Sequence, residues 1–198
     1  MNFKQYLSLI FFCISTSITP GPNNLMIMLS GLNHGIKKSL PHYYGICFGF
    51  CMLLAIVGLG CNTLLVTYSS IRNSIKVMGI TYMVYLMIKT IFASTPLTIN
   101  DKTSPISFVQ AVLLQWVNPK VWMMATGVFA AFNLSYVNNY KQTIQIILIF
   151  GFIVAPCIAI WMIGGAMLHT LLQDERRLRW FNYALGSLLI LSIILSVF

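Results

Sequence analysis

Acidic residues are almost absent from this sequence. Only 3 of its 198 residues are Asp or Glu, and the charged residues together make up 8% of the chain. In a soluble domain about a quarter of the residues are charged, whereas here 58% are hydrophobic. We therefore predict an integral membrane protein. The formal charge of +9 fits basic loops beside anionic lipid, so the expected partner is the bilayer and not a nucleic acid.

Motifs of enzyme active sites are missing as well. The chain has no Gly-rich phosphate loop, no paired carboxylates and no activated serine, which argues against ATP-driven transport and enzyme activity. His34, His42 and His169 lack Cys or acidic neighbours at ligand spacing, so we expect neither a metal site nor a cofactor. The five cysteines lie in apolar segments without a CxxC motif and are expected to be small buried hydrophobic residues: Cys13, Cys47, Cys51, Cys61 and Cys157.

Six apolar segments follow one another, and each is long enough to cross a bilayer. Their approximate limits are residues 7–31, 40–66, 71–93, 108–132, 143–171 and 179–198. We predict an all-α polytopic membrane protein with one transmembrane domain over residues 1–198. Seven Lys and Arg residues lie around the first, third and fifth connections, and four lie on the opposite side. This bias predicts that the odd connections are cytoplasmic and that both termini are outside.

The first apolar segment is interrupted near its middle by the sequence TPGPNN (residues 19–24). Two prolines remove backbone donors and clash with the preceding turn, and asparagine oxygens are suited to cap a restarted helix. A break at this depth persists only inside protein or beside a polar cavity, because lipid offers no hydrogen-bond partners. We predict a broken first helix with a binding site at the break. A proline kink that only shapes helix packing is the alternative.

The fourth apolar segment contains a second interruption, QWVNPK (residues 115–120). Each break thus falls in the first helix of a group of three, and an odd number of crossings inverts the second group. This predicts two inverted three-helix repeats, about 1–95 and 104–198, with broken helices 1 and 4 around one midplane site.

Lys120 is either a partner for a substrate carboxylate or a lysine that reaches to the interface. Tyr82 and Trp116 are second-rank candidates for cavity walls.

Two such breaks suit a zwitterionic ligand. A half-helix that begins within the membrane presents unpaired N–H groups and a positive dipole end to a carboxylate. The carbonyl groups freed at the end of the other half-helix are acceptors for an ammonium group. Four glycines elsewhere are predicted to mark close helix contacts: Gly45, Gly49, Gly164 and Gly165.

Four stretches of the chain resemble the LysE/RhtB family of amino-acid exporters. They are TPGPNNLMIMLSGLNHG from residue 19, GICFGF from residue 45, GITYMVYLMIK from residue 79 and SPISFVQAVLLQWVNPK from residue 104. The resemblance runs in order through nearly the whole chain. It implies a secondary transporter of the bacterial inner membrane that exports small amino acids by alternating access. The substrate-binding positions that it implies are Pro20, Gly21, Pro22, Asn23, Asn24, Asn118, Pro119 and Lys120.

The expected substrates are neutral, such as cysteine, O-acetylserine, threonine or homoserine, because no acidic residue lies in an apolar segment to pair with a cationic side chain. Many relatives carry an Asp in the second helix where this chain has Phe50 and Cys51, so proton coupling is implied by the family alone. Two other functions stay open. Cys47 and Cys51 share a helix face, which suits a thiol-redox carrier, and the chain would also serve as a non-transporting membrane subunit. A second copy of the chain is a further partner that the sequence leaves open.

Overall fold

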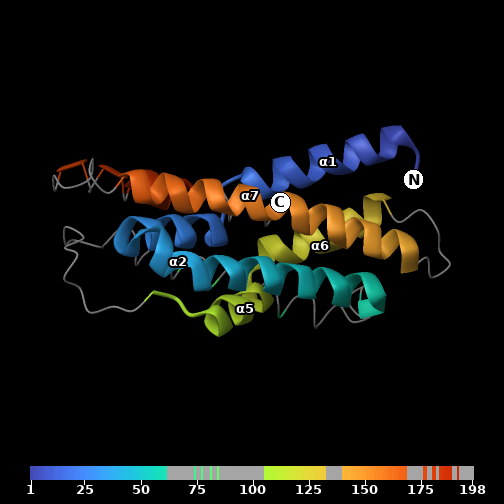
Figure 1. Cartoon of the computed structure of the whole chain (residues 1–198), viewed down its shortest axis with the longest axis horizontal. Coiled ribbons are helices and arrows are strands. Elements are labelled where there is room, and N and C mark those ends of the chain that lie inside the picture. Colours follow the sequence, from blue (N-terminus) through green and yellow to red (C-terminus); the bar gives the residue numbers. More distant parts are fainter. Residues whose placement is uncertain are drawn as a thin grey trace.

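The computed structural model describes residues 1–61, 105–132, 140–168, 176–177, 180–181 and 183–188, and single residues 74, 77, 81, 84 and 191. Over the three long ranges the chain forms α1 (Phe3–Ile18), α2 (Pro22–Ile56), the π-helix η1 (Val57–Cys61), α5 (Phe108–Val117), α6 (Pro119–Phe132) and α7 (Tyr140–Leu168) (Figure 1). This confirms the all-α prediction. The third predicted segment, which includes Tyr82, lies almost wholly outside the described residues, so the six-helix repeat arrangement stays a prediction.

The first apolar segment is divided into two helices, as its sequence predicts. Helix α1 begins with a capping box, in which the Asn2 side chain accepts from the Gln5 amide and the Gln5 side chain accepts from the Asn2 amide. It ends at Ile18, and Thr19 takes an extended conformation. Helix α2 then begins at Pro22, where a missing N–H costs nothing because the first helical N–H groups have no intrahelical partner.

Helix α2 has two arms. Gly35 interrupts it with φ 73° and ψ 172°, a left-handed φ that glycine adopts without strain. The chain folds back there, so that residues 22–34 form a first arm and residues 36–56 a second arm that runs in the reverse direction (Figure 1). Ser39 closes the turn by donating to the Gly35 carbonyl and by sharing a hydrogen bond with Ser30. The first arm therefore completes the first apolar segment, and the second arm begins the next one.

The fourth apolar segment is also broken. Helix α5 begins with a capping box formed by Ser107 and Gln110, and Asn118 separates its end from the start of α6 at Pro119. The two broken segments lie side by side in opposite directions, because Phe12 meets Phe132 near one end, Thr19 meets Lys120 at the breaks, and Asn23 meets Gln115 beyond them. Their two breaks consequently lie at the same level.

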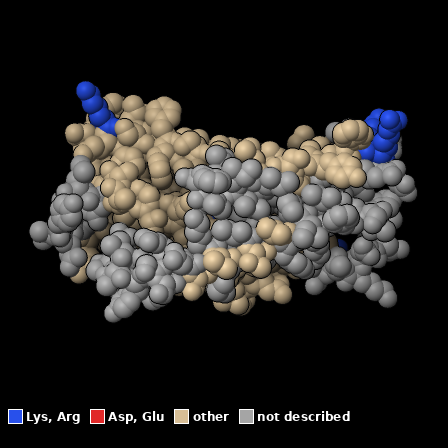
Figure 2. Space-filling model, turned by 180° about the vertical axis from the view of Figure 1, so that it is seen from behind, with Lys and Arg blue, Asp and Glu red and all other residues tan. Residues whose placement is uncertain are grey.

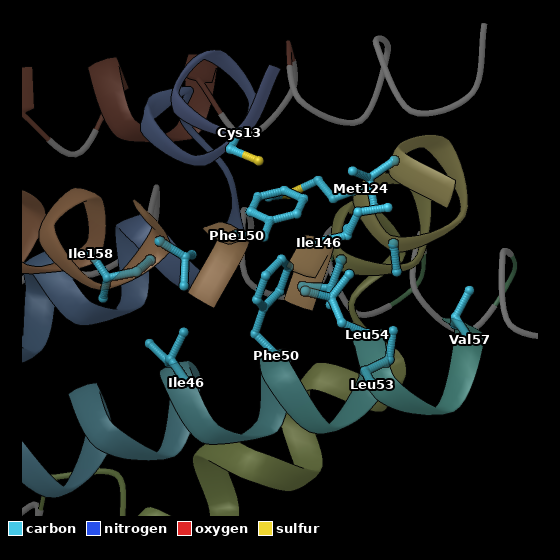
Figure 3. Close-up of a cluster of buried hydrophobic side chains, with 14 of the residues drawn as sticks. Cys13, Ile46, Phe50, Leu53, Leu54, Val57, Met124, Ile146, Phe150 and Ile158 are labelled. Atoms are coloured by element: carbon cyan, nitrogen blue, oxygen red, sulfur yellow. The ribbon is translucent and has the colours of Figure 1, made fainter. Parts of the chain in front are cut away.

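The core lies between the second arm of α2 and α7. Phe50 and Phe150 point toward each other in an edge-to-face contact, with ring centroids 4.9 Å apart (Figure 3). Phe12 of α1 adds a second edge-to-face contact to Phe150 at 6.2 Å. Cys13 is fully buried in the same cluster, as expected of a small hydrophobic residue. All four cysteines whose side chains are described are free thiols. This core positions the helices that surround the two breaks.

Glycines allow the closest helix contacts. A Cβ atom at Gly45 would lie 2.6 Å from the Ala111 Cβ, and one at Gly49 would lie 2.7 Å from the Gln115 Cγ, so both glycines let α2 approach α5. A Cβ at Gly165 would collide with the Met28 carbonyl. These three contacts were predicted. The described residues do not support the prediction for Gly164, because a Cβ there would meet none of them within 4 Å.

The described helices have the surface of a membrane protein. Within the described part of the chain, two stretches are long and apolar enough to cross a membrane by length and composition: Tyr140–Leu168, and Pro22–Leu59, which the turn at Gly35 divides into two arms. Helices α1 and α5 are shorter apolar helices. On the face in Figure 2, the described Lys and Arg side chains lie toward the two ends of the molecule, with no described Asp or Glu between them. Basic side chains at the two ends are expected of a membrane protein that contacts lipid headgroups there.

Candidate functional site

A small cavity lies where the two breaks meet. Its polar lining comes from both breaks and from the end of α1: Thr16, Ser17, Gly21, Asn23, Asn24, Asn118 and Lys120. Its apolar lining comes from α2, α6 and α7: Ile46, Phe50, Val121, Met124, Val154 and Ile158. The cavity is only about 20 Å³ in volume, which is close to what one water molecule requires. An amino acid therefore fits only if the surrounding helices move apart.

The backbone carbonyls at the end of α1 already have side-chain donors. The Asn24 side-chain amide donates to the carbonyls of Ser17 and Thr19, at 2.8 Å each. Trp161 of α7 donates to the Ile18 carbonyl at 3.2 Å. Groups freed by the break are thus satisfied by protein rather than by water, as a site at membrane depth requires. The expectation that these carbonyls lie open to a substrate ammonium group is wrong for this state.

The start of α2 is different, because no described side chain caps it. The expectation that the asparagines cap this helix is wrong. Asn24 turns its amide to α1, and Asn23 pairs with Gln115, donating to the Gln115 Oε1 at 2.6 Å and accepting from its Nε2 at 3.3 Å. The positive end of the α2 dipole therefore faces the cavity without a capping oxygen, which is the arrangement that favours an anion.

Ser17 adds an unsatisfied hydroxyl to the same cavity. Its side chain is only 3% exposed, and its Oγ has no hydrogen-bond partner within the described structure. A buried hydroxyl without a partner costs about 1–3 kcal/mol, so such groups are rare in the absence of a function. The Ser17 hydroxyl and the uncapped start of α2 are both donors, and together they could hold one carboxylate.

The second break is capped within its own segment. The Asn118 Oδ1 accepts from the Lys120 amide at 3.1 Å, which makes Asn118 the N-cap of α6. Trp122 donates its ring N–H to the Trp116 carbonyl at 2.8 Å, and the two indole rings pack edge to face. This break therefore leaves fewer groups for a ligand than the first one.

Lys120 joins the two breaks. Its Nζ donates to the Thr19 carbonyl at 2.5 Å, the Thr19 hydroxyl at 2.8 Å and the Pro20 carbonyl at 3.2 Å. To reach them, the side chain crosses directly over Gly21, where a Cβ would lie 2.7 Å from the lysine Cδ. Lys120 therefore does not extend to an interface, and its ammonium group occupies the acceptor end of the first break.

Sequence reasoning identified the breaks but not every residue around them. Of the eight predicted substrate-binding residues, five line the cavity: Gly21, Asn23, Asn24, Asn118 and Lys120. The prolines shape the chain instead, since Pro22 and Pro119 begin helices and Pro20 contributes its carbonyl to Lys120. Trp116 is outside the cavity lining, and Tyr82 lies outside the described residues. Ser17 and Gln115 were missed, although a polar run before the break, STSIT (residues 15–19), signals donors at membrane depth.

Comparison with known proteins identifies the family. The profile described as LysE type translocator matches residues 14–194. The chain belongs to this family. A cysteine/O-acetylserine efflux protein of Klebsiella pneumoniae subsp. pneumoniae is 27% identical to it over 175 residues, which cover 88% of this chain and 89% of that protein. One from Escherichia coli O1:K1 is 25% identical over 181 residues, which cover 90% of each chain. No solved structure matches the chain.

Membership of the LysE type translocators settles the class of protein. The matched region spans both breaks, so the two breaks and the cavity belong to the translocator unit. Translocators are transporters and not enzymes, which confirms the prediction that this chain has no enzyme activity. The helical structure and apolar surface fit a membrane protein of this family.

Proposed function

We propose that this chain exports small neutral amino acids, with cysteine and O-acetylserine as the first candidates, from the cytoplasm across the bacterial inner membrane. The family and the names of its relatives support export of this substrate class. The observation that carries the proposal is the cavity where the two broken helices meet. On one side lie unsatisfied donors, which suit a carboxylate, and on the other lie carbonyls that already hold one ammonium group, that of Lys120. Such a pairing of groups matches the two charges of an amino acid.

The carboxylate binds at the start of α2. The uncapped N–H groups there and the Ser17 hydroxyl supply hydrogen bonds, and the helix dipole supplies favourable potential. The substrate side chain packs against apolar groups such as Phe50, Met124 and Ile158. Lys120 places a positive charge on the cavity wall, and none of the described lining residues is acidic. A cationic side chain such as that of lysine is therefore disfavoured by like-charge repulsion.

Transport proceeds by alternating access. The cavity is too small for an amino acid in the described state, so binding requires the two broken segments to separate on one side at a time. Their antiparallel arrangement supports the proposal of two inverted three-helix repeats. The bias of Lys and Arg toward the odd connections supports the proposal that both termini are outside. The proton gradient is the proposed driving force. If an uncoupler leaves efflux from energised vesicles unchanged, the proton coupling is refuted.

The central experiment measures efflux of labelled amino acids from preloaded proteoliposomes. We expect efflux of cysteine and O-acetylserine, slower efflux of threonine and homoserine, and no efflux of lysine. Ser17→Ala removes a hydroxyl that has no partner in the described structure, so it should leave the fold stable. It should weaken substrate binding by about tenfold to a hundredfold, the usual effect of losing a hydrogen bond to a charged group.

The matched control is Ser15→Ala. Ser15 lies in the same helix, is exposed and donates to the Phe12 carbonyl one turn away, so the loss of its hydroxyl should leave transport unchanged. Equal effects of both variants would argue against a carboxylate site at Ser17. A variant without cysteines should export normally. Loss of all transport in that variant, with its fold intact, would favour the thiol-redox carrier, and no transport by the unmodified chain would favour the subunit.

A further inference from the structure

The Lys120 ammonium group occupies a set of acceptors that also suits the ammonium group of an amino acid. Its Nζ contacts two backbone carbonyls and one hydroxyl at the end of α1, the acceptor end of the first break. The substrate carboxylate is proposed to bind a few atoms away, at the start of α2. These acceptors hold one ammonium group at a time, so Lys120 and the substrate compete for them.

The position of Lys120 in its own helix supports this role. Lys120 is the second residue of α6, where the helix dipole is positive and a cation is unfavourable. Its Nζ lies between the negative end of the α1 dipole and the positive start of α2, so the carbonyls of Thr19 and Pro20, and not a helix dipole, stabilise the charge there. Lys120 is therefore placed on α6 at a cost to that helix, and its charge acts on the opposite broken segment. This is expected of a group that bridges the two halves of a transporter.

We propose that Lys120 is an internal substitute for the substrate's ammonium group, which satisfies the first break when the transporter is empty and is displaced when substrate binds. The proposal rests on the proposed function. It assigns Lys120 to the return of the empty transporter, because that step leaves the carbonyls of Thr19 and Pro20 without a substrate. When substrate is present on both sides, the substrate performs this role in each direction.

The two transport modes separate this role from a purely structural one. Net efflux into buffer without substrate requires the empty transporter to return, whereas exchange against external substrate does not. For Lys120→Met, which keeps an unbranched side chain of similar length and removes the ammonium group, we expect the ratio of net efflux to exchange to fall by about tenfold or more, since one charge-assisted hydrogen bond changes an equilibrium by at least that factor.

Gly21→Ala provides an independent test that keeps the charge. Its Cβ would lie 2.7 Å from the Lys120 Cδ and 3.1 Å from its Nζ, so it displaces the flexible side chain from the carbonyls rather than moving backbone. We expect the same fall in the ratio of net efflux to exchange. In the Lys120→Met background, Gly21→Ala should lower this ratio no further, because the group that it displaces is already absent.

The control is Lys4→Met, which removes an exposed lysine near the start of α1 and should leave both modes unchanged. Equal losses of exchange and net efflux in Lys120→Met and in Gly21→Ala would overturn the proposal, and so would additive effects in the double variant. If Lys120→Met does not fold, Gly21→Ala alone decides by the same ratio. If the unmodified chain shows neither mode, the proposed function itself fails, which is a different result.

Discussion

Gly165 and Gly164 are adjacent in α7 and should respond oppositely to alanine. A Cβ at Gly165 would collide with the Met28 carbonyl oxygen and lie 2.7 Å from its carbon, so α2 and α7 must move apart. Overpacking of this kind costs about 1–3 kcal/mol, and a backbone neighbour places this site at the upper end. The higher helix propensity of alanine relative to glycine stabilises the helix by about 1 kcal/mol. We therefore expect Gly165→Ala to lower the free energy of unfolding by about 2 kcal/mol.

Gly164→Ala is the matched control, because it gains the same helix propensity and its Cβ would meet none of the described residues within 4 Å. It should raise the free energy of unfolding by up to about 1 kcal/mol. For a chain of this size, each kcal/mol moves Tm by about 2–4 °C. Thermal unfolding of the purified protein in detergent should therefore separate the two variants by about 6–12 °C. Equal Tm values would show that α2 and α7 do not touch at Gly165.

Two further substitutions test the second break and the core. Asn118→Ala removes the cap of α6 and should lower the free energy of unfolding by about 1 kcal/mol, whereas Asn118→Asp keeps the acceptor and should recover most of it; denaturant titration would measure both. Phe50→Ala opens a cavity against Phe150 and should cost about 3–5 kcal/mol. Phe50→Leu, which retains most of the volume, should cost much less in the same titration, and equal costs would argue against tight packing there.

The sequence predicts those features of the fold that depend on local chemistry. Prolines and extended residues fix the breaks before Pro22 and Pro119 whatever surrounds them. Contacts between helices are less predictable. Successive residues of a helix point about 100° apart, so only one of Gly164 and Gly165 can face a given neighbour, and packing alone decides which.

For the candidate site, too, the local features were predictable and the contacts between distant residues were not. The sequence shows that each break frees backbone groups, but it does not show which side chains satisfy them. Asn24 is an example, since its amide serves the preceding helix rather than capping its own. Lys120 is another, because its partners Thr19 and Pro20 are about a hundred residues away and meet it only through the antiparallel pairing of the broken segments.

The first break is asymmetric, and this asymmetry bears on how substrate enters. Its acceptor end is closed by donors from three elements, Asn24, Lys120 and Trp161, while its donor end has neither a described cap nor a partner for the Ser17 hydroxyl. A carboxylate therefore finds its partners free, but an ammonium group must first displace Lys120. Under the proposed role of Lys120, a ligand with only a carboxylate would fill the open end without releasing the contact that joins the two broken segments. A ligand with both charges would replace that contact, which explains why the same site would accept and move α-amino acids.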